Sequence, residues 1–203
     1  MLLYAYSRKI TMYYLTEMQV TVRVPPRRFG EPIEKVIVDL AREKYENSVD
    51  PETGLIVAVN NVISLSPGKI VPGDGATYHE VVFNAVTYKP LKGEIIQGEV
   101  AETIKFGVFL RLGCTDALSH MSQIGQEKFA LSTKKGGVLV GRDTGRQLRV
   151  GDNVRAKVIN ASIDHVSMKI AVTMKHPRLG THGWREAIKE ENEKKKAAKE
   201  RKN

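Results

Sequence analysis

Two phenylalanines that flank a glycine, followed by a histidine, are the side chains in this sequence best suited to bind a nucleic acid. Phe106 and Phe109 lie on either side of Gly107, and His120 follows after a short polar turn. An exposed pair of aromatic rings offers a surface on which bases stack, which contributes about 1–3 kcal/mol per base. Gly107 is expected to permit a β-bulge that redirects the neighbouring ring. These residues predict a site for single-stranded nucleic acid.

Basic side chains near these aromatic positions are expected to meet the phosphates. They are Lys105, Arg111 and Lys169. Each aromatic residue also has a structural interpretation, in which the two rings pack in a core and His120 caps an element or lies at the edge of a core. Residue types alone leave both interpretations open.

The charge of the chain is concentrated in its second half. The formal net charge is +9, of which residues 1–88 carry −1, residues 89–180 carry +7 and residues 181–203 carry +3. A basic surface attracts phosphate backbones because binding releases their counterions. The same excess also fits a solvated basic face without a ligand, so charge alone does not decide between the two.

The first half of the sequence predicts a small α+β module. Residues 18–24 alternate apolar and polar side chains, as a half-buried strand does. Pro32 suits the first turn of a helix, and apolar residues then recur at helical spacing up to about Tyr45. Residues 55–65 and 78–88 are predicted strands, which gives the order β-α-β-β.

The second half predicts a β-barrel, and Lys89-Pro90 marks the boundary before it. Five short strands are expected at residues 93–104, 107–112, 117–121, 153–162 and 168–173. A long polar connection separates the third strand from the fourth. This pattern is typical of the partly open Greek-key barrel of the OB-fold.

The same half resembles the S1 domain family of RNA-binding barrels. The residues that carry the resemblance are Gly98, Val100, Phe106, Gly107, Phe109, Leu118, His120 and Ser122. Two positions depart from the usual pattern: Ala117 stands where glycine is usual, and Ser119 stands where an apolar residue is usual. The resemblance implies RNA contacts at Phe106, Phe109 and His120, with a basic contact at Lys169 on the last strand.

Further motifs extend the resemblance to the family of archaeal RNA polymerase stalk subunits E-prime, the counterpart of the seventh subunit of eukaryotic RNA polymerase II. The motifs lie at residues 22–32, 43–46, 68–78, 136–142, 148–152 and 173–180. The resemblance covers about residues 12–185. Members of this family usually begin near the position of Met12, so residues 1–11 are interpreted as an extension or as the result of a start site assigned too early.

This resemblance implies an RNP-like tip domain that docks on the polymerase core and an S1 domain that binds emerging single-stranded RNA. Docking is expected through the tip loop formed by Gly68, Lys69, Ile70, Val71, Pro72, Gly73, Asp74 and Gly75. A second, small and mainly helical stalk subunit is expected to bind along both domains as a heterodimer partner. The expected location is the cytoplasm, with the polymerase on the nucleoid.

The predicted organisation therefore has four parts. They are an extension at 1–11, a tip domain at 12–88, an S1 domain at 89–180 and a basic tail at 181–203. The tail is expected to be a frayed helix or disordered. The fold class is α+β.

No catalytic, cofactor or metal site is predicted. The five histidines and the single Cys114 lack zinc-site spacing, and no phosphate-binding G-x-x-x-x-G-K-[ST] loop occurs. The sequence contains no apolar run of about 18 residues, so no membrane span is predicted. A free-standing S1 protein that acts in translation or RNA decay is the alternative function, and an S1-bearing nuclease would need an acidic metal cluster that the sequence does not suggest.

Overall fold

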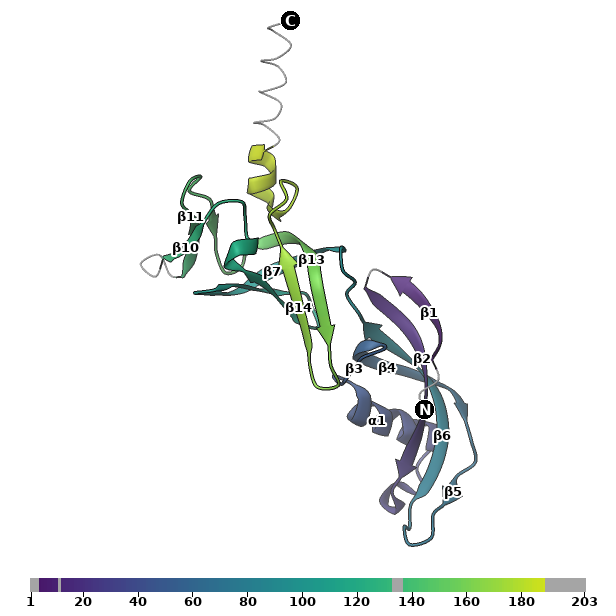
Figure 1. Ribbon diagram of the computed structural model, residues 1–203. Helices are drawn as coiled ribbons and strands as arrows, with labels where there is room; N and C mark the ends of the chain where they lie inside the picture. Colours follow the sequence, from purple (N-terminus) through teal and green to yellow (C-terminus); the bar gives the residue numbers. More distant parts are fainter. Residues whose placement is uncertain (1–3, 11, 133–136, 189–203) are drawn as a thin grey trace, which may run out of the picture. The chain divides into compact units, whose positions relative to one another are not determined.

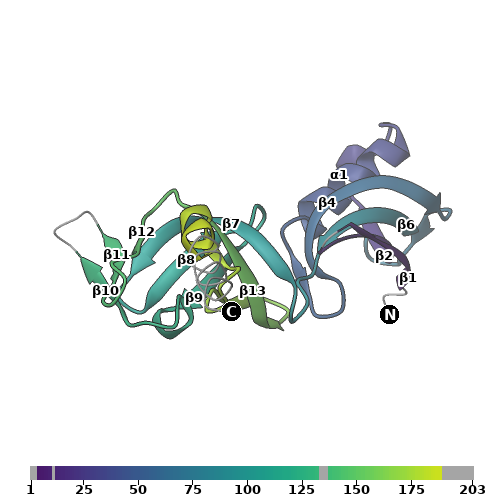
Figure 2. The ribbon, with the colours of Figure 1, turned by 90° about the horizontal axis from the view of Figure 1, so that it is seen from above.

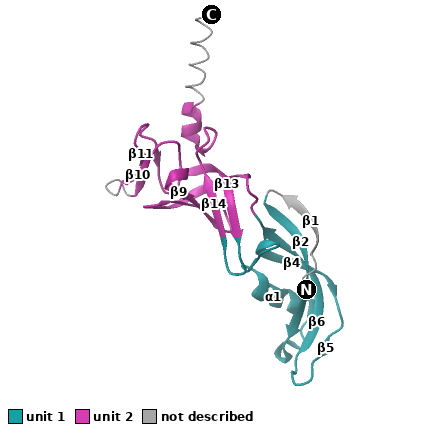
Figure 3. Ribbon diagram, in the orientation of Figure 1, with its two compact units in different colours: residues 1–89, 163–168 teal, residues 90–162, 169–203 magenta. Residues whose placement is uncertain are grey.

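The computed structural model describes residues 4–10, 12–132 and 137–188. The chain divides into two compact units, shown in separate colours in Figure 3. Unit 1 contains residues 1–89 and 163–168, and unit 2 contains residues 90–162 and 169–203. The division falls beside the predicted boundary at Lys89-Pro90, but it places residues 163–168, expected in the S1 domain, in unit 1. The four predicted ranges and their roles stay predictions.

Unit 1 is a curved sheet with one long helix. Its elements are β1 (Tyr4–Ile10), β2 (Tyr13–Val24), the 3-10 helix η1 (Pro26–Arg28), α1 (Ile33–Tyr45), β3 (Val49–Asp50), β4 (Gly54–Leu65), β5 (Lys69–Ile70) and β6 (Thr77–Tyr88). The strand order is β1-β2-β6-β4-β3, and β5 pairs with β6. The predicted β-α-β-β order corresponds to β2, α1, β4 and β6 and is confirmed.

Helix α1 covers one face of this sheet, as Figure 2 shows. Its buried residues Val36, Ile37 and Ala41 lie on one side because they recur at helical spacing. They pack against the alternate, inward residues of β2 and β6, among them Met18 and Phe83. Burial of this apolar stripe against the sheet stabilises the unit, because the helix alone or the sheet alone would expose its apolar face to water.

Residues 4–10, interpreted from the sequence as an extension, form β1 at the edge of the sheet (Figure 1). The strand pairs antiparallel with β2, with Tyr4 opposite Met18 and Ile10 opposite Tyr13. The tight turn between the strands includes Met12, whose φ is 60°. Residues 4–10 therefore add a strand to the sheet of unit 1.

Unit 2 is a closed five-stranded barrel with additions. The barrel strands are β7 (Ile95–Ile104), β8 (Gly107–Arg111), β9 (Asp116–His120), β13 (Asn153–Ile163) and β14 (Met168–Thr173). Their order is β14-β9-β8-β7-β13, and pairing of β14 with β13 closes the barrel. The short β15 (Gly180–Thr181) pairs with β13. The predicted α+β class with a C-terminal S1/OB barrel is confirmed.

The long connection between the third and fourth barrel strands forms a small sheet of its own. Its strands are β10 (Phe129–Ser132), β11 (Val138–Gly141) and β12 (Gln147–Leu148). Glu127 holds the turn that leads into β12, because its carboxylate accepts hydrogen bonds from the backbone N–H groups of Asp143 and Thr144 at 2.9 and 3.0 Å. Desolvation alone would raise the pKa of Glu127, but the hydroxyl of Thr144, which also donates to the carboxylate, and these two backbone donors outweigh it, so the pKa lies below its ordinary value.

Residues 182–188 follow the barrel, are helical and are anchored by Trp184. The Trp184 ring stacks on Phe129 of β10 at a centroid distance of 5.7 Å, and the Arg146 guanidinium lies 5.9 Å from the ring. Residues 189–203 of the predicted tail lie outside the described residues. Among the described residues, no helix is both long and apolar enough to cross a membrane.

Candidate nucleic-acid interface and docking loop

The hairpin of β7 and β8 exposes Phe106 at its turn. Ile104 pairs with Gly107, so Lys105 and Phe106 form a two-residue loop. The Phe106 side chain is 53% exposed, which places it outside the barrel core. The Met121 N–H donates a hydrogen bond of 2.7 Å to the Phe106 carbonyl and ties this turn to the end of β9.

Phe109 and His120 lie on the outer face of the same strands. Val108 and Leu110 are buried, and because side chains alternate along a strand, Phe109 points outward, where it is half-buried. His120 is exposed and pairs with Gly107, the residue after Phe106. The structure therefore brings Phe106 and His120 together at one end of the outer face, with Phe109 farther along it.

His120 also has the structural role that the sequence left open. The Ser122 N–H donates a hydrogen bond of 3.2 Å to His120 Nδ1, so the histidine caps the 3-10 helix η2 (Met121–Gln123). Capping fixes the orientation of an imidazole that remains exposed.

Gly107 is needed for close strand packing, and the prediction of a bulge at this position is wrong. A Cβ atom on Gly107 would lie 2.2 Å from the Ser119 carbonyl oxygen of β9, closer than any carbon can approach. The irregularity in this hairpin instead falls in β7, between Val100 and Glu102. The ring of Phe106 is exposed because it lies in the turn, without a bulge to redirect it.

The two predicted cations Arg111 and Lys169 lie at the other end of the outer face. Arg111 pairs with Glu99 on one side and Asp116 on the other. Lys169 precedes Ile170, which pairs with Ala117, so it lies beside Asp116. Arg111 is four residues along β8 from Gly107, or roughly 13 Å. Carboxylates thus alternate with these cations, and only Lys105 of the predicted basic residues adjoins Phe106.

The predicted docking loop, residues 68–75, lies between β4 and the start of β6 and presents apolar side chains. Lys69 and Ile70 form β5, which pairs with Tyr78 and Thr77 of β6. Ile70 is 75% exposed and Val71 is 46% exposed. Phe29, which follows η1, is also exposed. Contiguous exposed apolar surface marks sites that a protein partner covers, and Ile70 and Val71 contribute two adjacent apolar side chains to this loop.

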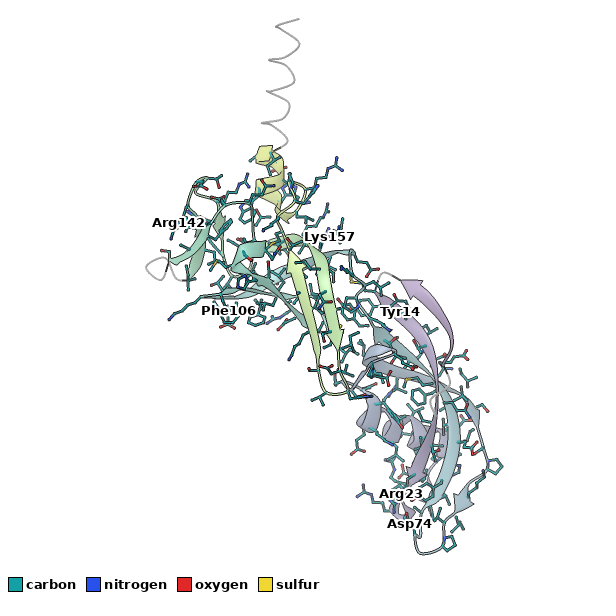
Figure 4. The ribbon with its side chains drawn as sticks, viewed as in Figure 1. Tyr14, Arg23, Asp74, Phe106, Arg142 and Lys157 are labelled. Carbon is teal, nitrogen blue, oxygen red and sulfur yellow. The ribbon has the colours of Figure 1, made fainter. Side chains whose placement is uncertain are left out.

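Asp74 gives the docking loop its shape, as Figure 4 shows with Arg23 beside it. The Arg23 guanidinium donates two hydrogen bonds of 2.7 Å to its carboxylate, and the Tyr78 hydroxyl donates a third of 2.7 Å. The bidentate partner Arg23, followed by Tyr78, lowers the pKa of Asp74 well below its ordinary range. Sequence reasoning identified Asp74 but missed Arg23, which lies 51 residues away with no local signal to connect the two.

Two positions of the loop require glycine for different structural reasons. A Cβ on Gly68 would lie 2.8 Å from the ring of the buried His79. That ring donates from Nδ1 to the Ser66 carbonyl at 3.0 Å. Gly73 has a φ of +89° with open space around it, so its backbone conformation, not crowding, requires glycine.

Within the described ranges, no cluster of three or more His, Cys, Asp or Glu side chains is placed to hold a metal ion.

Similarity to known proteins identifies the family of this chain. DNA-directed RNA polymerase subunit Rpo7 of Saccharolobus shibatae is 37% identical over 175 residues, which cover 85% of this chain and 97% of that protein. This chain belongs to the Rpo7 family. Rpo7 of Sulfolobus acidocaldarius is 34% identical over 174 residues, covering 85% of this chain and 94% of that subunit. The resemblance to the polymerase stalk family is thereby confirmed.

Both units match known domains of this family, and a eukaryotic polymerase subunit is also similar to this chain. Residues 19–75 match the SHS2 domain found in the N terminus of Rpb7p and Rpc25p, and residues 89–170 match the S1 RNA binding domain. DNA-directed RNA polymerase II subunit rpb7 of Schizosaccharomyces pombe is 25% identical over 170 residues, covering 83% of this chain and 98% of that subunit.

Proposed function

We propose that this protein is the RNA-binding stalk subunit of a DNA-directed RNA polymerase. Its first unit docks on the core subunits, and its S1 barrel binds emerging single-stranded RNA during initiation, elongation and termination. The observation that carries this proposal is the match to Rpo7 over 85% of the chain, which spans both units. A free-standing S1 protein would share only the barrel with its relatives.

The docking loop 68–75 is suited to insert into a pocket of a protein partner. Ile70 and Val71 supply apolar surface whose burial stabilises a complex. The hydrogen bonds from Arg23 and Tyr78 to Asp74 order the loop before it binds. A loop that is already ordered loses less conformational entropy on docking, so more of the burial energy remains as affinity.

The barrel is suited to hold a flexible strand without reading its sequence. Phe106 and Phe109 offer rings for base stacking, and Lys105 supplies charge for a phosphate at the same turn. Each stacked base contributes about 1–3 kcal/mol and every base has a π-face, so little sequence preference is expected.

The polymerase supplies the nucleotidyl transfer, and we assign to this subunit binding without chemistry or a cofactor of its own. The small helical stalk subunit is the proposed direct partner, in a one-to-one heterodimer. The proposed location is the cytoplasm, with the polymerase on the nucleoid.

Assembly and RNA binding test the two halves of the proposal separately. Full-length tagged protein, expressed with the helical stalk subunit and the core subunits, is expected to co-purify with the polymerase. Phe106→Ala and Phe109→Ala are expected to weaken binding of a fluorescent uridine oligonucleotide by the heterodimer about tenfold or more per ring. A chain that purifies alone, or unchanged RNA affinity in both variants, contradicts the corresponding half.

A further inference from the structure

A basic loop follows β14 at the end of the barrel where Phe106 lies. Strand β14 runs parallel to β9, with Ile170 opposite Ala117, so both strands end on the same side. The Met174 N–H donates a hydrogen bond of 2.7 Å to the Gln123 carbonyl in η2. Since η2 begins directly after His120, the segment that follows β14 starts next to the aromatic turn.

The loop is held in a defined conformation by its own hydrogen bonds. The Leu179 N–H donates to the His176 carbonyl at 2.8 Å, and the Arg178 N–H donates to His176 Nδ1 at 3.2 Å. Met174 and Leu179 are buried and anchor the two ends. The residues between them, 175–178, are all exposed, so Lys175, His176 and Arg178 face solvent from an ordered turn.

The charge at this end of the barrel differs from the charge at the other end of the outer face, where Arg111 lies. Residues 105–107, 118–124 and 172–179 contain no aspartate or glutamate, but they contain Lys105, Lys175, Arg178 and two histidines. Within the described part of the chain, neither Lys175 nor Arg178 lies at ion-pair distance from a carboxylate. Neither charge is therefore paired within that part of the chain, whereas Arg111 has a carboxylate on both neighbouring strands.

We infer that the basic loop, residues 175–178, binds the phosphates of the RNA strand whose bases stack on Phe106 and Phe109. The inference rests on the proposed RNA binding and extends it with a site for the backbone. Gly107, His120 and the end of β14 at Thr173 lie on three successive strands, so roughly 10 Å separates the first from the last. A strand that stacks at the turn therefore passes the basic loop, and Lys175 and Arg178 replace Arg111 and Lys169 as its main phosphate contacts.

Salt dependence of binding tests the inference in the full-length chain bound to the helical stalk subunit. The affinity for a fluorescent uridine oligonucleotide is measured across a range of salt concentrations for wild type and for K175Q/R178Q. Loss of two phosphate contacts is expected to reduce the slope of log affinity against log salt by about 1.4, since each contact contributes roughly 0.7 for single strands. Between about 50 and 200 mM salt, the ratio of wild-type to variant affinity then shrinks about sevenfold.

The matched control is K92Q/K157Q, which also removes two positive charges but near the start of β7, where Lys92 precedes the strand and Lys157 of β13 pairs with it. Lys157 pairs with Ile95, nine residues from Ile104, or about 30 Å along the strand from the aromatic turn. Figure 4 shows Phe106 and Lys157 well separated in unit 2. The control is expected to keep the wild-type slope, and far-ultraviolet circular dichroism checks that both variants are folded.

The outcomes separate this inference from the proposed function. If wild type binds RNA and F106A/F109A weakens binding, but K175Q/R178Q has the same slope as its control, the basic loop is not a phosphate site and the RNA platform stands. If wild type binds no RNA, both the platform and the basic loop are overturned. A reduced slope in K175Q/R178Q alone supports the basic loop.

Discussion

At the scale of single residues, the contact between Gly107 and the Ser119 carbonyl limits what this hairpin tolerates. Gly107→Ala is expected to destabilise the barrel by about 1–3 kcal/mol, because the added methyl group forces two paired strands apart. Gly183→Ala is the control, since nothing lies within 4 Å of a Cβ at that position. Thermal unfolding measures both, and equal melting temperatures for the two variants would show that the strands do not approach so closely.

Two buried hydroxyl groups are expected to respond in opposite ways to removal. Ser119 is fully buried on the inward face of β9, and its Oγ has no hydrogen-bond partner among the described residues. Ser119→Ala is expected to leave stability unchanged or raise it, since an unpartnered buried hydroxyl costs about 1–3 kcal/mol.

Thr87 provides the contrast, because its Oγ1 lies 3.0 Å from Thr16 Oγ1 in a buried pair. Thr87→Val keeps the shape but leaves Thr16 without its partner, so a loss of about 1–3 kcal/mol is expected. Denaturant unfolding measures both variants. A larger loss of unfolding free energy for Ser119→Ala than for Thr87→Val would contradict an unpartnered hydroxyl at Ser119 and a hydrogen-bonded one at Thr87.

At the scale of elements, the docking loop should keep its shape far into the acid range. The pKa of Asp74 is lowered in the folded state, so its bond to Arg23 is present above the ordinary aspartate pKa. The stabilising contribution is lost only as pH falls through the lower, folded-state pKa. Carbon-13 NMR of the Asp74 carboxyl group is expected to show a titration midpoint below about 3.9, the ordinary aspartate value.

Arg23→Gln tests the cause of this shift. The substitution removes the bidentate donor and is expected to raise the Asp74 midpoint toward the ordinary value, whereas the exposed Arg27, outside this contact, serves as control through Arg27→Gln. A wild-type midpoint at the ordinary value would mean that the loop lacks the Arg23 contact.

Periodicity in the sequence is sufficient to predict the main elements. The apolar stripe that predicts a helix up to Tyr45 contains Val36, Ile37 and Ala41, and these residues are buried on α1. The small β10–β12 sheet escapes prediction because its strands have two to four residues and lie in a polar connection that the sequence does not separate from a loop.

The site residues are predicted less completely, because the spacing of nearby residues does not determine strand register or contacts between residues far apart in the sequence. Phe106 and His120 adjoin as expected, but β8 and β14 place Arg111 and Lys169 at the far end of the face. Lys175 and Arg178 reach the turn only through pairing of β14 with β9. The absence of acidic residues from 172–179 is the one sequence signal that could point to them.

At the scale of the whole molecule, docking and RNA binding are expected to be separable. Gly73→Val forces a β-branched residue into a φ of +89° and is expected to weaken co-purification with the polymerase core while RNA affinity stays within about twofold. F106A/F109A is expected to do the reverse. If either variant impaired both properties to the same degree in a folded protein, the assignment of one role to each unit would be wrong.

The most direct measurement is photo-crosslinking of a nascent transcript in an assembled elongation complex. A photoreactive phenylalanine analogue replaces Phe106 in one sample and Lys157 in the other, and the polymerase extends a radiolabelled RNA past its exit. The expected result is a crosslink from position 106 to the transcript, with little from position 157. A transcript that crosslinks at position 157 but not at position 106 would contradict RNA capture on the aromatic turn.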